Sequence, residues 1–179
     1  MWRGNARWHF AAGEVLGGIT TGLLLVLLGS LLRPALPIWL RLVLLGLLAA
    51  VVAGNESGLV RVRLPQNGRQ VPSTVINEGG RTGAWQFGFE MGTGLRTYMT
   101  SSLPHLAALT VALFAGWPHA LVAGAAFGAG RAVMPLARLG WGDGADWDRR
   151  YSLAGRPFRL VTAATLLAAV TALAIDAIP

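Results

Sequence analysis

Two apolar stretches decide the fold: VLGGITTGLLLVLLGSLL, from Val15 to Leu32, and LPIWLRLVLLGLLAAVVAG, from Leu36 to Gly54. Each is close to the ~20 residues that an α-helix needs to cross the ~30 Å hydrocarbon core of a bilayer. Between them, Arg33, Pro34 and Pro37 interrupt the helix, because proline cannot continue helical hydrogen bonding. The pattern predicts two consecutive transmembrane helices, at 15–32 and 36–54, joined by a tight turn.

Three further apolar segments extend this prediction to the rest of the chain. The segment 84–116 would be ~50 Å long as one helix, too long for a single perpendicular crossing. We therefore expect it to be broken near Pro104, where the hydroxyls of Thr100, Ser101 and Ser102 can satisfy backbone groups freed by the break. The last two crossings are expected at 119–136 and 160–178. The sequence predicts an all-α, polytopic transmembrane helix bundle with about five crossings, a single membrane domain over residues 1–179.

The charge distribution predicts the orientation of this bundle. All 15 basic residues are arginines, against eight acidic residues. With five crossings, the N-terminus and the polar stretches 55–83 and 137–159 share one side of the membrane. The N-terminus holds Arg3 and Arg7, and the two stretches hold four and five arginines, respectively. The other side holds little charge beyond Arg33. Arginine-rich loops stay on the cytoplasmic side. We expect both stretches to be cytoplasmic loops of a cell membrane protein (inner or plasma membrane) with a cytoplasmic N-terminus.

Within the first loop, valines 60 and 62 and Leu64 alternate with Arg61 and Arg63 ahead of Asn67-Gly68, which is compatible with a short β-ribbon. The arginines of the chain are scattered between apolar runs and form no continuous basic stripe, so no nucleic-acid partner is expected. The expected surroundings are a lipid bilayer and either partner membrane subunits or further copies of the chain.

Several kinds of chemistry are excluded or disfavoured by the sequence. There is no cysteine, so disulfides and thiol chemistry are impossible. His105 and His119 lie beside prolines without carboxylates at metal-ligand spacing, and the cluster of aspartates 143, 146 and 148 lacks the glutamate that would complete a calcium loop. No hydrolase, metalloprotease or dinucleotide-binding motif is present. We expect no metal, no cofactor and no enzymatic activity.

The ionisable residues Glu90, Arg96 and Arg131 fall at membrane depth, where each costs at least ~2.5 kcal/mol without a partner. Gly88 and Gly92, and likewise Gly124 and Gly128, have the four-residue spacing of close helix contact. The three ionisable residues are candidate partners for one another. If 84–116 packs on 119–136 through these glycines, Glu90 or the hydroxyls of Thr100, Ser101 and Ser102 would meet Arg131. This polar centre is either a structural ion pair or a cavity at a helix break that binds a small anion or polar solute.

The stretch from Gly88 to Gly140 resembles a known family. It reads Gly-Phe-Glu-Met-Gly-Thr-Gly, then Thr-Ser-Ser-Leu-Pro, a short apolar helix, and Ala-Phe-Gly-Ala-Gly-Arg-Ala-Val-Met-Pro. This is similar to one three-helix repeat of the CcdA/DsbD-type membrane thiol transporters, in which a proline-broken helix is followed by a glycine-rich helix. The resemblance implies a scaffold with a broken-helix cavity. Because Thr100 to Pro104 holds no cysteine, the electron-transfer role of that family does not carry over.

Two functional hypotheses follow. The first is a non-redox membrane protein of carrier or accessory type whose centre is formed by the broken segment and helix 119–136. The second is a structural or assembly subunit of a larger membrane complex.

Overall fold

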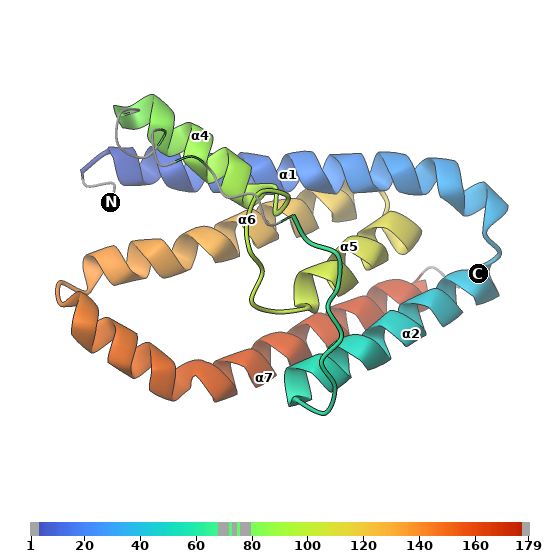
Figure 1. Ribbon diagram of the computed structural model, residues 1–179. Helices are drawn as coiled ribbons and strands as arrows, with labels where there is room; N and C mark the ends of the chain where they lie inside the picture. Colours follow the sequence, from blue (N-terminus) through green and yellow to red (C-terminus); the bar gives the residue numbers. More distant parts are fainter. Residues whose placement is uncertain (1–3, 68–71, 73–74, 76–79, 177–179) are drawn as a thin grey trace. The chain divides into compact units, whose positions relative to one another are not determined.

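The computed structural model describes residues 4–67, 72, 75 and 80–176, and every regular element among them is a helix (Figure 1). The α-helices are α1 (Ala6–Leu32), α2 (Ile38–Ser57), α4 (Gly80–Gly92), α5 (Leu103–Phe114), α6 (Trp117–Gly140) and α7 (Gly144–Asp176), and a 3-10 turn, η1 (Arg33–Ala35), follows α1. The predicted all-α class is confirmed. No β-ribbon forms over Val60 to Asn67; the proposed turn residue Gly68 lies outside the described residues.

Four of these helices, α1, α2, α6 and α7, are long and apolar enough to cross a membrane. Helices α4 and α5 have 13 and 12 residues. At 1.5 Å per residue they are only about 20 Å long, too short to cross the hydrocarbon core alone. The structure therefore contains four candidate membrane spans and one apolar segment divided into two short helices.

The break in that segment is wider than predicted and begins earlier. Residues 93–102 are non-helical. Helix α4 ends at Gly92 because Gly94 adopts a φ of +69°, a conformation that suits glycine and stops a helix. Pro104, expected to cause the break, lies in the first turn of α5, where proline is tolerated. Glycine ends the first half-helix, and proline only marks the start of the second.

The polar stretch 137–159, predicted as a loop, is helical except at residues 141–143. Its polarity does not prevent helix formation because the charges stabilise the start of α7. Asp143 Oδ1 accepts hydrogen bonds from the backbone N–H groups of Ala145 at 2.9 Å and Asp146 at 3.3 Å, as an N-cap does. Asp146 in turn pairs with Arg149 and Arg150, one turn further on.

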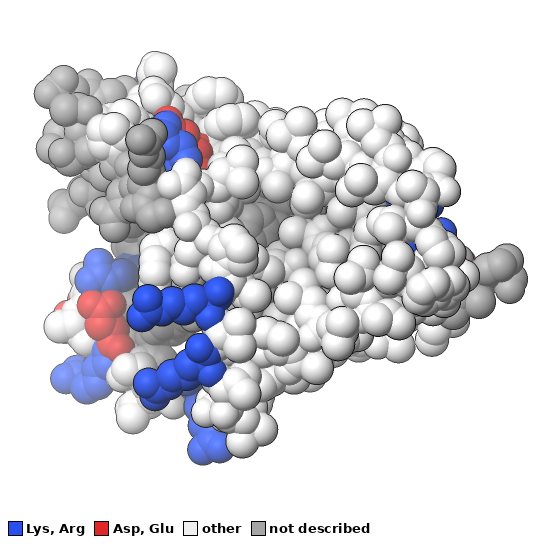
Figure 2. All heavy atoms as spheres, turned by 45° about the vertical axis from the view of Figure 1, so that its right-hand side comes forward, with Lys and Arg blue, Asp and Glu red and all other residues white. Residues whose placement is uncertain are grey.

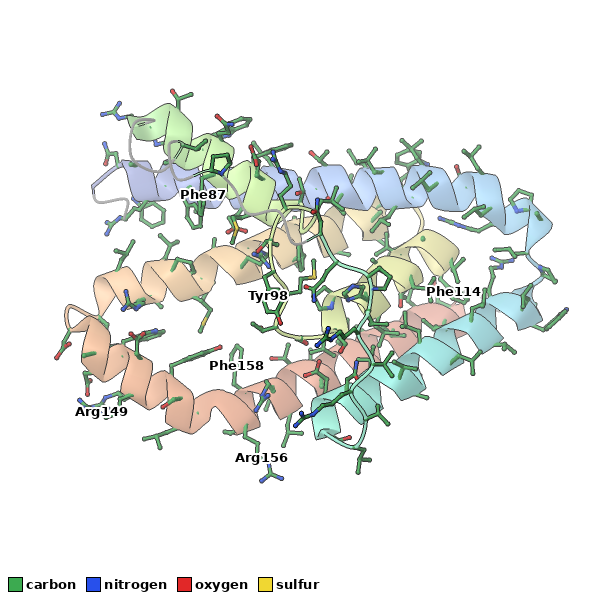
Figure 3. All side chains as sticks on the ribbon, in the orientation of Figure 1. Phe87, Tyr98, Phe114, Arg149, Arg156 and Phe158 are labelled. Atoms are coloured by element: carbon green, nitrogen blue, oxygen red, sulfur yellow. The ribbon has the colours of Figure 1, made fainter. Side chains whose placement is uncertain are left out.

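The chain divides into two compact units. Unit 1 comprises Met1–Leu23, Gln66–Tyr98 and Leu121–Ser152, and unit 2 comprises Leu24–Pro65, Met99–Ala120 and Leu153–Pro179. The core of unit 2 is an apolar cluster contributed by α2, α5 and the second half of α7. Phe114 on α5 is one of its members (Figure 3). The buried members are Leu45, Val52, Leu103, Leu106, Leu113, Phe114, Val170 and Ala174. In unit 1 the close helix contacts are made by glycines.

Candidate functional site: a buried ion pair among glycine-packed helices

The most buried ionisable side chain described is Glu14, on α1 in unit 1, with 1% of its surface exposed. Its Oε2 lies 3.4 Å from Nε of Arg131, on α6. The sequence pointed to Arg131 but not to Glu14, because Glu14 directly precedes Val15, where the first crossing was expected to begin. The available signal was the glycine pattern around it, with Gly13, Gly17 and Gly18 on the same helix.

Glycines bring three helices together at Glu14. A methyl group on Gly92 of α4, or on Gly128 of α6, would overlap the backbone carbonyl oxygen of Glu14. One turn away, Gly88 approaches Phe10 in the same manner, and Gly124 approaches Gly18. Helix α4 therefore runs parallel to α1, and α6 runs antiparallel to it. The close packing of these three backbones encloses the Glu14 side chain.

The four glycines selected from the sequence are all at close helix contacts, but their partner differs from the one considered. The sequence suggested that the two glycine faces pack on each other. In the structure both faces pack on α1, which presents glycines of its own: Gly13 and Gly17 toward α4, and Gly18 toward α6. The first helix is thus the centre of unit 1.

Arg131 also reaches the non-helical segment of unit 1. It follows Gly128 by three residues and so lies on the same side of α6. Its Nη2 donates a hydrogen bond of 3.0 Å to Oγ1 of Thr97, which is itself buried. Its guanidinium also lies over the ring of Phe127, 5.7 Å from the ring centre. Glu14, Arg131 and Thr97 thus form a polar centre made by two helices and the broken segment.

Glu90 pairs with Arg96, one of the pairings that the sequence left open, and not with Arg131. Its Oε2 lies 3.0 Å from Nη1 of Arg96, across the end of α4, and Gln86 Nε2 donates to its Oε1 at 3.2 Å. The side chain of Arg96 is 43% exposed, so this pair is much less enclosed than Glu14–Arg131. The prediction that Glu90 is the acidic partner of Arg131 is therefore wrong. Glu14 is that partner, and Glu90 pairs with Arg96 near the end of its own helix.

Ser101 and Ser102 belong to unit 2, where they hold the start of α5. Oε1 of Glu56 accepts hydrogen bonds from the Ser101 hydroxyl and from the Ser102 N–H, both 2.8 Å. Ser101 Oγ also accepts the Leu103 N–H at 3.1 Å, as expected for hydroxyls that satisfy freed backbone groups. A carboxylate at this position interacts favourably with the positive end of the helix dipole.

The other end of α5 is held by arginines. Arg33 Nε donates to the Ala112 carbonyl at 2.9 Å, and Arg41 Nη1 donates to the Leu113 carbonyl at 3.3 Å. These carbonyls belong to the last turn, where a helix leaves acceptors unsatisfied and favours positive charge. An apolar helix of 12 residues therefore has a carboxylate at its N-terminus and two guanidinium groups at its C-terminus.

Among the residues that the structure describes, no group of three or more histidine, aspartate or glutamate side chains is arranged to hold a metal ion. His105 is engaged elsewhere, with Nε2 lying 2.8 Å from the Pro65 carbonyl oxygen. No protein-family model, curated protein or solved structure matches this chain. The resemblance of residues 88–140 to one CcdA/DsbD-type repeat stays a prediction.

Proposed function

We propose that this chain is a non-enzymatic, multi-pass membrane protein of carrier type, and that the polar centre of Glu14, Arg131 and Thr97 binds a small anionic or polar solute. The observation that supports the proposal best is the incomplete pairing of a buried charge. Glu14 Oε2 and Arg131 Nε are 3.4 Å apart, yet neither makes a hydrogen bond within the described part of the chain.

Incomplete pairing matters because buried ions are costly. A buried ion pair repays its desolvation only when its geometry is good and its remaining hydrogen-bonding groups are satisfied. Two apolar side chains in place of Glu14 and Arg131 would pack the three helices without the desolvation cost of buried charges. The presence of ionisable residues within a membrane span therefore favours a functional role for them. The donors that Arg131 retains are suited to a carboxylate or phosphate group.

The position of the pair fits a site within the membrane. Glu14 lies eight residues after the start of α1 and Arg131 nine residues before the end of α6. These spacings correspond to about 12 and 14 Å along the two antiparallel helices. Both residues therefore lie at a similar depth, beside the non-helical residues 93–98 of unit 1. Broken helices at such a depth occur where they are buried in protein or line a cavity that holds solute.

The topology that accompanies this proposal has five crossings, with the broken segment counted as one and the N-terminus cytoplasmic. The arginine distribution supports it, since a sixth crossing would place the arginine-rich stretch 137–159 outside. Because the chain has no cysteine, single cysteines report orientation directly. An impermeant maleimide added to intact cells should label Ala35→Cys and spare Ser152→Cys; the reverse pattern would overturn the orientation.

The binding proposal is tested with purified protein in mild detergent. Thermal unfolding is followed for the wild type with a panel of small carboxylates, phosphate and neutral polar solutes, and then for Arg131→Ala. We expect at least one panel member to raise the unfolding temperature of the wild type and to have no effect on Arg131→Ala. Arg149→Ala, which removes an exposed arginine paired with Asp146, is the matched control and should retain the response.

The alternative hypothesis, an assembly subunit, is supported by a second small-residue face on α6. Ala126 and Gly130 are exposed and four residues apart, on the side opposite Gly124 and Gly128. A methyl group on Gly130 would meet nothing within 4 Å, which leaves space for another helix. If no solute stabilises the wild type, and Gly130→Leu releases a stoichiometric membrane partner from the gently solubilised protein, the assembly role replaces the carrier role.

A further inference from the structure

Four arginines of unit 2 have no charged partner among the residues that the structure describes: Arg61 and Arg63, which follow α2, and Arg156 and Arg159 on α7. All four are exposed, and none lies within ion-pair distance of a carboxylate in the described part of the chain. Arg159 makes one hydrogen bond, from Nε to the Gly155 carbonyl of its own helix. In contrast, Arg33 and Arg41 in the same unit are used by the last turn of α5. We call the four the arginine surface.

The part of this surface that follows α2 is held in place by hydrogen bonds. The Asn55 side chain binds the backbone of Val62 twice, accepting from its N–H at 2.8 Å and donating to its carbonyl at 2.9 Å. The Pro65 carbonyl is bound by His105. The hydrogen bonds to Asn55 hold the backbone of Val62, and Arg61 and Arg63 are its two chain neighbours. Hydrogen bonds to Asn55 and His105 therefore hold the segment that carries the two arginines.

Both parts of the surface adjoin the same apolar core. Leu64, next to Arg63, and Ala163, one turn after Arg159, pack against the buried cluster of unit 2. In Figure 1, α2 begins beside the last turns of α7 and runs in the opposite direction. The end of α2 and the arginine-bearing part of α7 in unit 2 therefore belong to the same end of the unit. Figure 3 shows Arg156 pointing away from α7, and Figure 2 shows that much of the face in view carries no charged side chain.

Exposed apolar side chains accompany these arginines. Leu59, Val60 and Val62 are exposed beside Arg61 and Arg63, and Phe158 is exposed between Arg156 and Arg159. No charged residue follows Arg159 in α7 until Asp176. Arginines and apolar side chains interleaved where an apolar helix begins are suited to the membrane interface, where the apolar groups enter the acyl boundary and the cations remain at headgroup level.

We propose that the arginine surface binds the phosphate groups of anionic phospholipids. Guanidinium groups donate hydrogen bonds to phosphate in a bidentate manner, and zwitterionic lipids offer no net negative charge in return. This explains the alternation of valine and arginine over residues 60–63, which forms no β-ribbon: apolar side chains enter the lipid while arginines bind its headgroups. The inference is independent of solute binding at Glu14 and Arg131, which lie in unit 1.

The first test measures lipid affinity in the purified, full-length chain. Binding of fluorescent phosphatidylglycerol and phosphatidylcholine in non-ionic detergent is compared for the wild type and two double variants, R61Q/R63Q and R156Q/R159Q. With ~1 kcal/mol for each arginine near a lipid surface, each pair should lower affinity for phosphatidylglycerol by about 30-fold. Phosphatidylcholine binding should not change, and millimolar inorganic phosphate should not displace the bound lipid.

The matched control is R149Q/R150Q, which removes two arginines from the same helix that are already paired with Asp146. It should lower affinity for phosphatidylglycerol less than threefold. An equal fall in the control, or full retention of lipid by both double variants, would show that the lipid responds only to net charge or binds elsewhere. Displacement by phosphate would show a free-anion site in place of a lipid site.

A second measurement leaves every arginine in place. Because the chain has no cysteine, Val62→Cys can carry a single fluorophore in an otherwise native protein. In bilayers that contain brominated phosphatidylglycerol, its fluorescence should be quenched more strongly than in bilayers with the same fraction of brominated phosphatidylcholine. Equal quenching by the two lipids would overturn the proposal even if the arginine variants failed to fold.

Discussion

Replacing Gly128 by alanine adds one methyl group where α6 and α1 are in backbone contact. That methyl would overlap the carbonyl oxygen of Glu14 and approach the Cα of Val15. Neither atom belongs to a flexible side chain, so relief requires the two helices to separate. Adding a methyl group to a well-packed interior typically costs about 1–3 kcal/mol. Alanine also favours the helix over glycine by about 1 kcal/mol, which partly offsets this cost.

Gly130 supplies the control, because it lies two residues away on the same helix and a methyl there meets nothing within 4 Å. Gly130→Ala gains the same helix propensity without the overlap. The difference between the two variants therefore isolates the contact with α1. We expect Gly128→Ala to be less stable than Gly130→Ala by about 1–3 kcal/mol.

The comparison uses reversible unfolding in mixed micelles with increasing dodecyl sulfate, followed by circular dichroism and tryptophan fluorescence. The free energies of unfolding of the two variants are compared at the wild-type midpoint. If Gly128→Ala proves as stable as Gly130→Ala, α6 does not contact α1 at Glu14, and the enclosure of the ion pair described above is wrong.

Three further predictions concern unit 2. Gly58→Ala should destabilise by about 1–2 kcal/mol in the same assay, because Gly58 caps α2 with a φ of +79°, whereas Gly46→Ala, in open space within α2, should not. Glu56→Gln removes the negative charge at the start of α5, at a cost of about 1 kcal/mol, and should speed exchange of the amide hydrogens of residues 102, 103 and 105 several-fold. Unchanged exchange would show that the carboxylate is dispensable. Arg33→Gln removes a guanidinium group only from the last turn of α5. It should therefore speed amide hydrogen exchange at residues 113–115 and leave exchange at residues 102, 103 and 105 unchanged. Equal effects at both ends of α5 would argue against local capping.

The sequence predicted the elements whose formation depends on length and composition. An unbroken apolar run of about 20 residues forms a helix in lipid because its backbone groups have no other partner. Helices α1 and α2 follow directly from this rule. The same rule predicted that 84–116 divides, since it is too long and too polar for one crossing. The glycine spacings at 88 and 92, and at 124 and 128, correctly indicated close helix contact.

Two local misjudgements have physical reasons. The break was assigned to Pro104, but a proline in the first turn costs a helix nothing, and the chain leaves the helix at Gly94 instead. The stretch 137–159 was expected to be a loop because it is polar. Polarity determines whether a segment is in lipid; capping by Asp143 and the pairs of Asp146 with arginines determine whether it is helical.

What the tertiary structure alone decided is the pairing of the residues. The sequence indicated that Arg131 needs a partner. Which residue becomes that partner depends on which glycine faces pack together. Four-residue glycine spacing occurs on α1, α4 and α6 alike, so it cannot tell which of these helices pack on one another. Ser101 and Ser102 were chosen with Glu90 as one centre, yet they bind Glu56 in the other unit. The sequence by itself determined that this chain forms apolar helices, because local hydrophobicity suffices for that. Only the packing of unit 1 decided that Glu14 is the carboxylate that pairs with Arg131, because a contact between residues so far apart in the sequence depends on the tertiary fold.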